Sequence, residues 1–320
     1  MTLNTYLEAF LDLAAMNPDN RPFHQLSPTQ ARETFELASQ RMRWSVPTRL
    51  AVHDHRLATR DGAALTVREY RQPSQAGQTL PVIAYFHGGG YVVGSLDSHD
   101  GVCRELAART GCAVLGVGYR LAPEHRFPTA FEDGEDMLLW LCEHGSPLGL
   151  DASTVIIAGD SAGATLAAAL AIRAVQQPFF GLGLKGQLLC YPVTDASGKR
   201  SSHTVFGEGY LLEDETLDWF YGHYARTDAD REDWRFSPLL AESLEGVAPA
   251  IVLLAGLDPL LDEGRAYAER LRSAGVDVQC LLEPGLTHDL LRLVSIVPQV
   301  TQVYDQLVAG VGQWLHGVPR

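Results

Sequence analysis

The chain has 320 residues, of which 46% are hydrophobic and 20% are charged, and its formal net charge is -14. This composition is typical of a soluble globular protein. The acidic balance, without any basic run, argues against a nucleic acid partner and against an anionic membrane surface. Because no apolar stretch is long enough to cross a bilayer, we expect no stable membrane association.

The first twenty residues predict an amphipathic helix rather than a signal peptide. They lack a basic n-region, and their apolar residues recur at helical spacing: Leu3, Leu7, Phe10, Leu11 and Ala14. A disulfide framework or a zinc site would need clustered cysteines, but the five cysteines are scattered. They are Cys103, Cys112, Cys142, Cys190 and Cys280. The sequence therefore predicts reduced cysteines and a cytoplasmic protein.

After residue 50, strand-like and helix-like segments alternate. The predicted strands are Val52–Ala58, Ala64–Tyr70, Val82–Phe86, Ala113–Val117, Val155–Ala158, Leu188–Tyr191, Ile251–Ala255 and Val276–Leu282. The predicted helices are Gly101–Thr110, Pro128–His144, Ala162–Gln176, Glu213–Tyr224, Glu263–Ser273 and Pro298–Leu315. Several strands are continuous apolar runs, which suit parallel strands buried on both faces, whereas the first two suit a hairpin. The pattern predicts an α/β fold with a mostly parallel eight-stranded sheet flanked by helices.

Two segments fall outside this alternation, namely residues 1–49 and residues 195–234. The second is rich in aromatic residues: Trp219, Phe220, Tyr221, Tyr224 and Trp234. We expect the two segments to fold together as a helical cap over a cleft. The predicted organisation is therefore a cap segment (1–49), the first part of the core (50–194), a cap insertion (195–234) and the second part of the core (235–320).

Ser161 lies in the pentapeptide Gly159-Asp160-Ser161-Ala162-Gly163, between a β-branched run and a helix-favouring run. This strand–turn–helix context lifts a serine hydroxyl above the edge of a sheet, and it is the context that a G-x-S-x-G nucleophile requires. Ser161 is therefore the predicted nucleophile.

An activated serine needs a base and an acid that orients the base. Asp258 follows one predicted core strand and His288 follows the next, so the chain order is serine, aspartate, histidine. Asp262 and Glu263 are rival acids, but they fit better as carboxylates in the first turn of a helix. We predict a triad of Ser161, Asp258 and His288.

Three consecutive glycines, Gly88, Gly89 and Gly90, follow the predicted strand 82–86. Glycines let backbone N–H groups approach a ligand without a side-chain clash. A phosphate-binding loop is excluded because no Lys-Ser or Lys-Thr follows. We predict that the amides of Gly88, Gly89 and Ala162 form an oxyanion hole for charge on a substrate carbonyl.

Together these motifs resemble the bacterial hormone-sensitive lipase-like esterases (family IV) of the α/β-hydrolase superfamily. The resemblance runs from about residue 40 to the C-terminus. It is carried by His87–Tyr91 with Gly94, Tyr119–His125 with Phe127-Pro128, Gly159–Gly163, Tyr191-Pro192, Trp219-Phe220 with His223-Tyr224, Ala255–Leu260 and His288. It implies a carboxylesterase acting on short- to medium-chain acyl esters under a helical cap. We expect acyl transfer without a cofactor. We also expect no metal, since the candidate ligands His53 and His55 lack a third ligand.

One departure concerns the two residues after the predicted base. The family commonly has Gly and Phe there, whereas this chain has Asp289 and Leu290. A carboxylate at this position would raise the pKa of His288 or contact a polar leaving group; the alternative is a solvent-facing aspartate. The candidate pocket residues are Tyr91, Phe206, Tyr210, Trp219 and Leu290.

Other functions stay open at this point. An amidase or a carbamate hydrolase would use the same triad. A third possibility is a non-enzymatic small-molecule receptor on this fold, similar to the plant gibberellin receptors. Such a receptor would be expected to lack the catalytic histidine, but His288 is present. The expected partners are a small ester and a second copy of the chain, because the last predicted strand would leave an unpaired sheet edge.

Overall fold

The computed structural model describes residues 2–16 and 21–316, and its centre is one eight-stranded sheet with the order β1-β2-β4-β3-β5-β6-β7-β8. Only β2 runs antiparallel to its neighbours β1 and β4, and the other neighbours are parallel. The strands are β1 (Ala51–Ala58), β2 (Ala64–Arg71), β3 (Leu80–Phe86), β4 (Ala113–Gly118), β5 (Leu150–Asp160), β6 (Leu184–Cys190), β7 (Ala250–Leu257) and β8 (Val278–Thr287). The predicted sheet and its first hairpin are confirmed.

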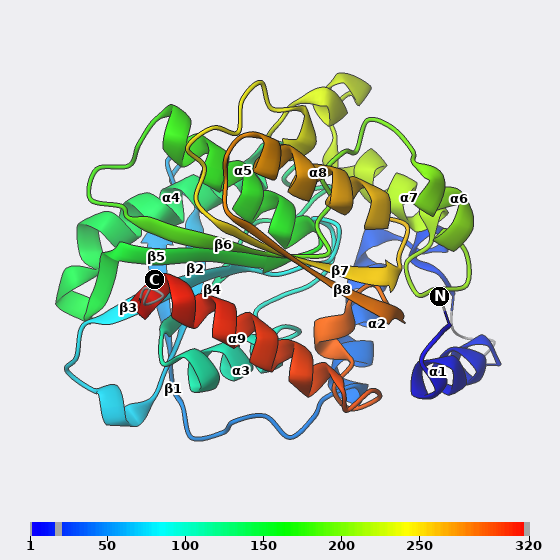
Figure 1. The fold of residues 1–320 in the computed structure, drawn as a ribbon, viewed down its shortest axis with the longest axis horizontal. Coiled ribbons are helices and arrows are strands. Elements are labelled where there is room, and N and C mark those ends of the chain that lie inside the picture. The colour runs from blue at the N-terminus through cyan, green and yellow to red at the C-terminus, as the bar shows by residue number, and fades with distance from the viewer. Residues whose placement is uncertain (1, 17–20, 317–320) are drawn as a thin grey trace.

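Helices cover both faces of this sheet (Figure 1). Helices α4 (Thr129–His144), α5 (Ala162–Gln176) and α8 (Leu261–Ser273) lie on one face, while α3 (Asp100–Thr110) and α9 (Val300–His316) lie on the other. The remaining helices are α1 (Thr5–Ala15), α2 (Pro28–Arg41), α6 (Ser201–Phe206) and α7 (Asp214–Tyr224). Within the described residues, no helix is long and apolar enough to span a membrane.

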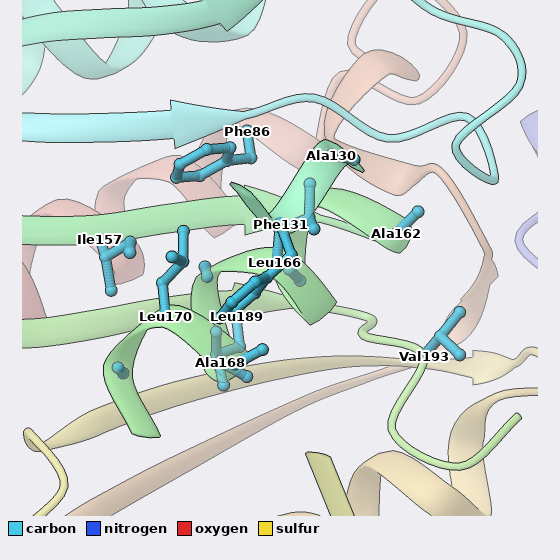
Figure 2. Close-up of a cluster of buried hydrophobic side chains, with 14 of the residues drawn as sticks. Phe86, Ala130, Phe131, Ile157, Ala162, Leu166, Ala168, Leu170, Leu189 and Val193 are labelled. Carbon is cyan, nitrogen blue, oxygen red and sulfur yellow. The ribbon is translucent and has the colours of Figure 1, made fainter. Parts of the chain in front are cut away.

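The core under α4 and α5 fixes the centre of the sheet. Helix α5 is buried from Ala162 to Ile172, as expected for a helix that is apolar on all sides. Figure 2 shows its leucines beside side chains of β3, β5, β6 and α4; the labelled set includes Phe86, Phe131, Ile157, Leu166, Leu170 and Leu189, all buried. The turn between β5 and α5 is therefore held by dense packing on either side.

The N-terminal segment contains a helix that we did not single out from the sequence. Helix α2 begins after Ser27, whose hydroxyl accepts a hydrogen bond from the Gln30 amide while the Gln30 side chain accepts from the Ser27 amide. This reciprocal capping box is a sequence signature of a helix start. The predicted first helix is present as α1; residues 1 and 17–20 of that prediction lie outside the described residues.

The N-terminal segment and the 195–234 insertion touch each other. The rings of Phe23 and Phe220 lie 6.1 Å apart, and His24 Nδ1 lies 3.2 Å from Thr216 Oγ1. Phe220 and Thr216 belong to α7, so this helix is in contact with the chain that leads into α2.

Candidate active site

Ser161 occupies the turn between β5 and α5 in a conformation that few non-glycine residues adopt, with φ +52°. Neighbouring glycines make this turn feasible. A Cβ on Gly163 would lie 2.0 Å from Phe86 O, and a Cβ on Gly159 would lie 2.4 Å from Gly163. Strained backbone of this kind persists where the surrounding structure enforces it, which is common at functional sites.

The three predicted triad residues form one hydrogen-bonded chain. His288 Nε2 lies 2.8 Å from Ser161 Oγ, and His288 Nδ1 lies 2.7 Å from Asp258 Oδ2. Asp258 is 1% exposed, and its Oδ1 accepts a hydrogen bond from the Leu260 amide at 2.9 Å. An aspartate on Nδ1 leaves Nε2 free to accept the serine proton.

Burial and the Asp258 carboxylate together set the pKa of His288. Burial alone lowers the pKa of His288, but the nearby Asp258 carboxylate and its hydrogen bond outweigh burial and raise the pKa above its usual value. The rival acids lie in the first turn of α8, as predicted. There Asp262 accepts from the Ser202 amide and Glu263 faces His203.

The glycine loop requires one correction. The amide of Gly88 does not face the cavity as a free donor; it donates to Asp160 Oδ1 at 3.0 Å. The amides of Gly89 and Gly90 are not engaged by another group within the described residues. Both glycines have positive φ, and a Cβ on Gly90 would lie 2.2 Å from the Phe220 ring. The amide of Ala162, at the first position of α5, has no intrahelical partner by its position.

Asp160 holds the glycine loop in place. It is 2% exposed, accepts from Tyr85 Oη at 2.6 Å, and lies 3.3 Å from His99 Nε2. Burial raises its pKa, but His99 and the Tyr85 hydrogen bond outweigh burial, and its pKa is lowered to about 2. An ionised Asp160 is thus an acceptor that orients the Gly88 amide. The sequence favours a loop-bracing role for Asp160 over a catalytic one. It does not reveal the Gly88 contact itself, which joins two strand ends that are adjacent only in the folded sheet.

Asp289 occupies a left-handed position, with φ +65°, which glycine adopts freely and aspartate tolerates better than most residues. It is not a free solvent-facing carboxylate, because its Oδ2 accepts from Arg292 Nη1 at 2.6 Å. Arg292 is 2% exposed, lies 4.3 Å over the Phe35 ring, and donates to Ser39 Oγ.

A group of potential metal ligands within the described residues includes Asp289. It comprises His99, Asp160 and Asp289, whose ligand atoms lie within 4.8 Å of one another. Arg292 already supplies a positive charge to Asp289, and His99 is paired with Asp160. We therefore interpret this group as a network of ion pairs and hydrogen bonds.

Replacing Asp289 with glycine should move the acid limb of the kcat/KM profile to lower pH. The carboxylate favours the imidazolium form of His288, and the base must be neutral to accept the serine proton. Without the charge, His288 therefore loses its proton at lower pH. Asp289→Asn is the matched control for backbone conformation and size, and it should shift the limb in the same direction. Profiles that coincide with the wild type for both variants would contradict a role for Asp289 in setting this pKa.

A cavity of about 490 Å³ opens onto Ser161 and His288. Of the predicted pocket residues, only Tyr91 lines it. Leu290 is fully buried in the core between the sheet and helices α3 and α9. The Phe206 ring packs against the Tyr210 ring. Residues that the sequence analysis did not select line the cavity instead, and they include Phe10, Leu11, Phe23, Phe35, Met42, Leu212, Leu217, Phe220, Tyr221 and Arg292.

Trp219 also lies outside the cavity lining, and helix geometry gives the reason. Trp219 packs on His223, with ring centroids 4.5 Å apart, while the next residue, Phe220, lines the cavity. Consecutive residues of an α-helix point about 100° apart. The sequence indicated the correct helix but the wrong face of it.

Comparison with known proteins shows which family the chain resembles in sequence and in structure. Residues 83–292 match a family described as alpha/beta hydrolase fold. An ethyl acetate hydrolase from Pseudomonas putida is 45% identical over 98% of this chain and 100% of that protein. An ester hydrolase structure from the metagenome of Lake Arreo is 35% identical with a TM-score of 0.93, covering 98% of this chain and 99% of that one. A hyperthermophilic esterase structure from the archaeon Pyrobaculum calidifontis is 33% identical with a TM-score of 0.91, at the same coverage.

Proposed function

The chain belongs to the bacterial family IV esterases of the α/β-hydrolase superfamily and is a carboxylic ester hydrolase, and from this premise we propose that Ser161, His288 and Asp258 hydrolyse short- to medium-chain acyl esters through an acyl-enzyme. The observation that carries the proposal is the chain of hydrogen bonds from Asp258 through His288 to Ser161, at the wall of the cavity.

The proposed reaction is acyl transfer in two halves. His288 Nε2 takes the proton from Ser161 Oγ as Oγ bonds to the ester carbonyl carbon, and Asp258 stabilises the resulting imidazolium. The proton then passes to the departing alcohol oxygen as the ester C–O bond breaks. Water, activated by the same histidine, attacks the acyl-enzyme and releases the acid and Ser161.

We place the oxyanion donors at the amides of Gly89, Gly90 and Ala162. Gly88 is left out because Asp160 already occupies its amide. Aligned amides stabilise the negative charge that develops on the carbonyl oxygen, and each such donor contributes about 3 kcal/mol to the transition state in comparable hydrolases.

We propose that the N-terminal segment and the 195–234 insertion together form the cap over this cavity. The cavity lining supports this proposal, since it includes Phe10 of α1, Phe35 of α2 and Phe220 of α7. The contact between Phe23 and Phe220 joins the two segments. The domain boundaries expected at residues 49, 195 and 234 remain part of this proposal.

Hydrolysis of p-nitrophenyl esters from acetate to palmitate tests the proposed substrate range. A cavity of about 490 Å³ lies within the range of small-molecule sites, so turnover should peak at short or medium acyl chains and fall steeply for palmitate. Maximal turnover of palmitate would contradict this range. Turnover of the matching anilides with none of the esters would favour the amidase alternative.

We also propose a homodimer joined at β8. The strand Val278–Thr287 is the last in the sheet, and β7 is its only strand partner within the described residues. The Asn4 amide donates to the Gly285 carbonyl at 2.9 Å, but a long edge without a strand partner favours association. Light scattering that shows a monomer at micromolar concentration would contradict this. A cytoplasmic location stays part of the proposal, supported by five unpaired cysteines.

A further inference from the structure

His203 is a buried histidine that joins three helices outside the triad. It lies on α6 and is 6% exposed. Its Nδ1 lies 2.7 Å from Asp214 Oδ1, at the start of α7. Its Nε2 lies 3.3 Å from Glu263 Oε2, in the first turn of α8. The imidazole thus stands between a helix of the insertion and a helix of the core, which are neighbours in Figure 1.

Both partners of His203 are held as hydrogen-bond acceptors. Glu263 is fully buried, and its Oε1 accepts from the amides of Thr194 at 2.7 Å and Asp195 at 3.3 Å. Asp214 accepts from Lys199 Nζ at 2.5 Å through its other oxygen. These donors favour the ionised form of each carboxylate. At Asp214 they outweigh burial and lower the pKa, whereas at Glu263 burial prevails and the pKa is raised above its usual value.

An imidazole between two carboxylates can donate to both only as imidazolium, because an ionised carboxylate has no proton to give. Burial lowers the pKa of His203, but the hydrogen bonds to Glu263 and Asp214 outweigh burial and raise the pKa above its usual value. Other charged groups on the elements packed around this site include Lys199, Asp218, Asp262 and the pair Asp195–Arg200. The geometry and these hydrogen bonds therefore both favour the protonated form of His203.

The helix held by this bridge is a wall of the substrate cavity. Thr216, Leu217, Phe220 and Tyr221 of α7 all line it. Beside His203, Ser202 Oγ donates to the carbonyl of Pro259 at 2.6 Å, next to the catalytic acid. His203 thus connects α6 to the cavity wall through α7, and its neighbour Ser202 contacts the loop that carries Asp258.

We propose that His203, as imidazolium, is a positioning residue that fastens the α7 wall of the cavity to α8, so that substrate binding weakens when this proton is lost. The inference rests on the proposed pocket. It differs from any role of His288, which must lose its proton for the reaction to proceed, whereas His203 must keep its proton for the wall to stay in place.

The opposite proton requirements separate the two histidines in a pH profile. The triad limb appears at low pH, where kcat/KM rises as His288 becomes neutral. The His203 effect appears above that limb, where KM for p-nitrophenyl butyrate should increase by about tenfold as the charged hydrogen bonds are lost. The turnover number kcat should stay within about twofold across that range.

Steady-state kinetics from about pH 6 to about pH 10, with wild type and His203→Gln, test the proposal. His203→Gln should show a raised KM already at neutral pH and no further rise at alkaline pH, with kcat nearly unchanged. Asp214→Asn removes one carboxylate and leaves Glu263, so the rise in KM should begin at lower pH than in the wild type. His223→Gln is the matched control, because His223 packs edge to face with Trp219 and bridges no carboxylates within the described residues, and it should keep the wild-type profile.

Two results would overturn the proposal. One is a wild-type KM that stays flat over the alkaline range, a measurement that needs no variant to fold. The other is a His203→Gln enzyme whose kcat and KM are both damaged together with a lowered Tm, which would mark a structural role only. Turnover that survives Ser161→Ala would instead refute the proposed triad, so the two failures are distinguishable.

Discussion

Replacing Ser161 with alanine is expected to lower kcat for p-nitrophenyl acetate by about 10⁶-fold. The hydroxyl is the only nucleophile that the geometry places at 2.8 Å from the base His288 among the described residues. The residual rate should come from the oxyanion donors and from substrate binding. The measurement is initial-rate hydrolysis with purified variant protein.

The matched control for this variant is Ser273→Ala. Ser273 is an exposed serine at the end of α8, and its hydroxyl donates to the Glu269 carbonyl on the same helix. Its replacement should leave the rate at the wild-type level. A Ser161→Ala enzyme that retains most of the wild-type rate, with an unchanged Tm, would mean that another group attacks the ester.

Replacing Asp258 with asparagine is expected to lower kcat by about 10⁴-fold. The residue is nearly the same size and is 1% exposed, so packing is preserved. An asparagine amide facing Nδ1 favours the wrong tautomer, with the proton on Nε2, and removes the charge that stabilises imidazolium. The acid limb of kcat/KM should also move to lower pH, since Asp258 raises the pKa of His288.

Asp262→Asn is the informative comparison, because the sequence offers Asp262 as a rival acid. The structure places Asp262 against the Ser202 amide, away from His288. Its replacement should cost less than about tenfold in kcat. A larger loss for Asp262→Asn than for Asp258→Asn would reverse the assignment of the acid.

The fold was accessible from the sequence, and so were the three residues that the structure joins by hydrogen bonds, because both rest on local patterns. Apolar runs marked the strands, and Ser161, Asp258 and His288 each follow a strand end, where parallel strands gather their loops on one side of the sheet. The strand boundaries were less accurate: β8 continues to Thr287, five residues past the predicted end, and delivers His288 directly at its terminus. Continuation through Glu283-Pro284-Gly285 depends on pairing with β7, which no local signal reveals.

The details that the sequence could not give are tertiary contacts between distant segments. We propose Gly90 rather than Gly88 as an oxyanion donor because the Gly88 amide is bound to Asp160, which lies 72 residues away in the chain. The rotation of α7 that turns Phe220 toward the cavity and Trp219 away from it depends on how the N-terminal segment packs. Arg292 entered no prediction, because a single arginine near a chain end gives no sign that it will be buried beside the base.

The most direct test of the central claim is labelling of the active enzyme with a fluorophosphonate, which traps an activated serine, followed by peptide mass mapping. We expect a single adduct, located on Ser161, whose formation matches the loss of ester hydrolysis. An adduct on a different residue, or an enzyme that stays unlabelled and unaffected while it still hydrolyses esters, would contradict it.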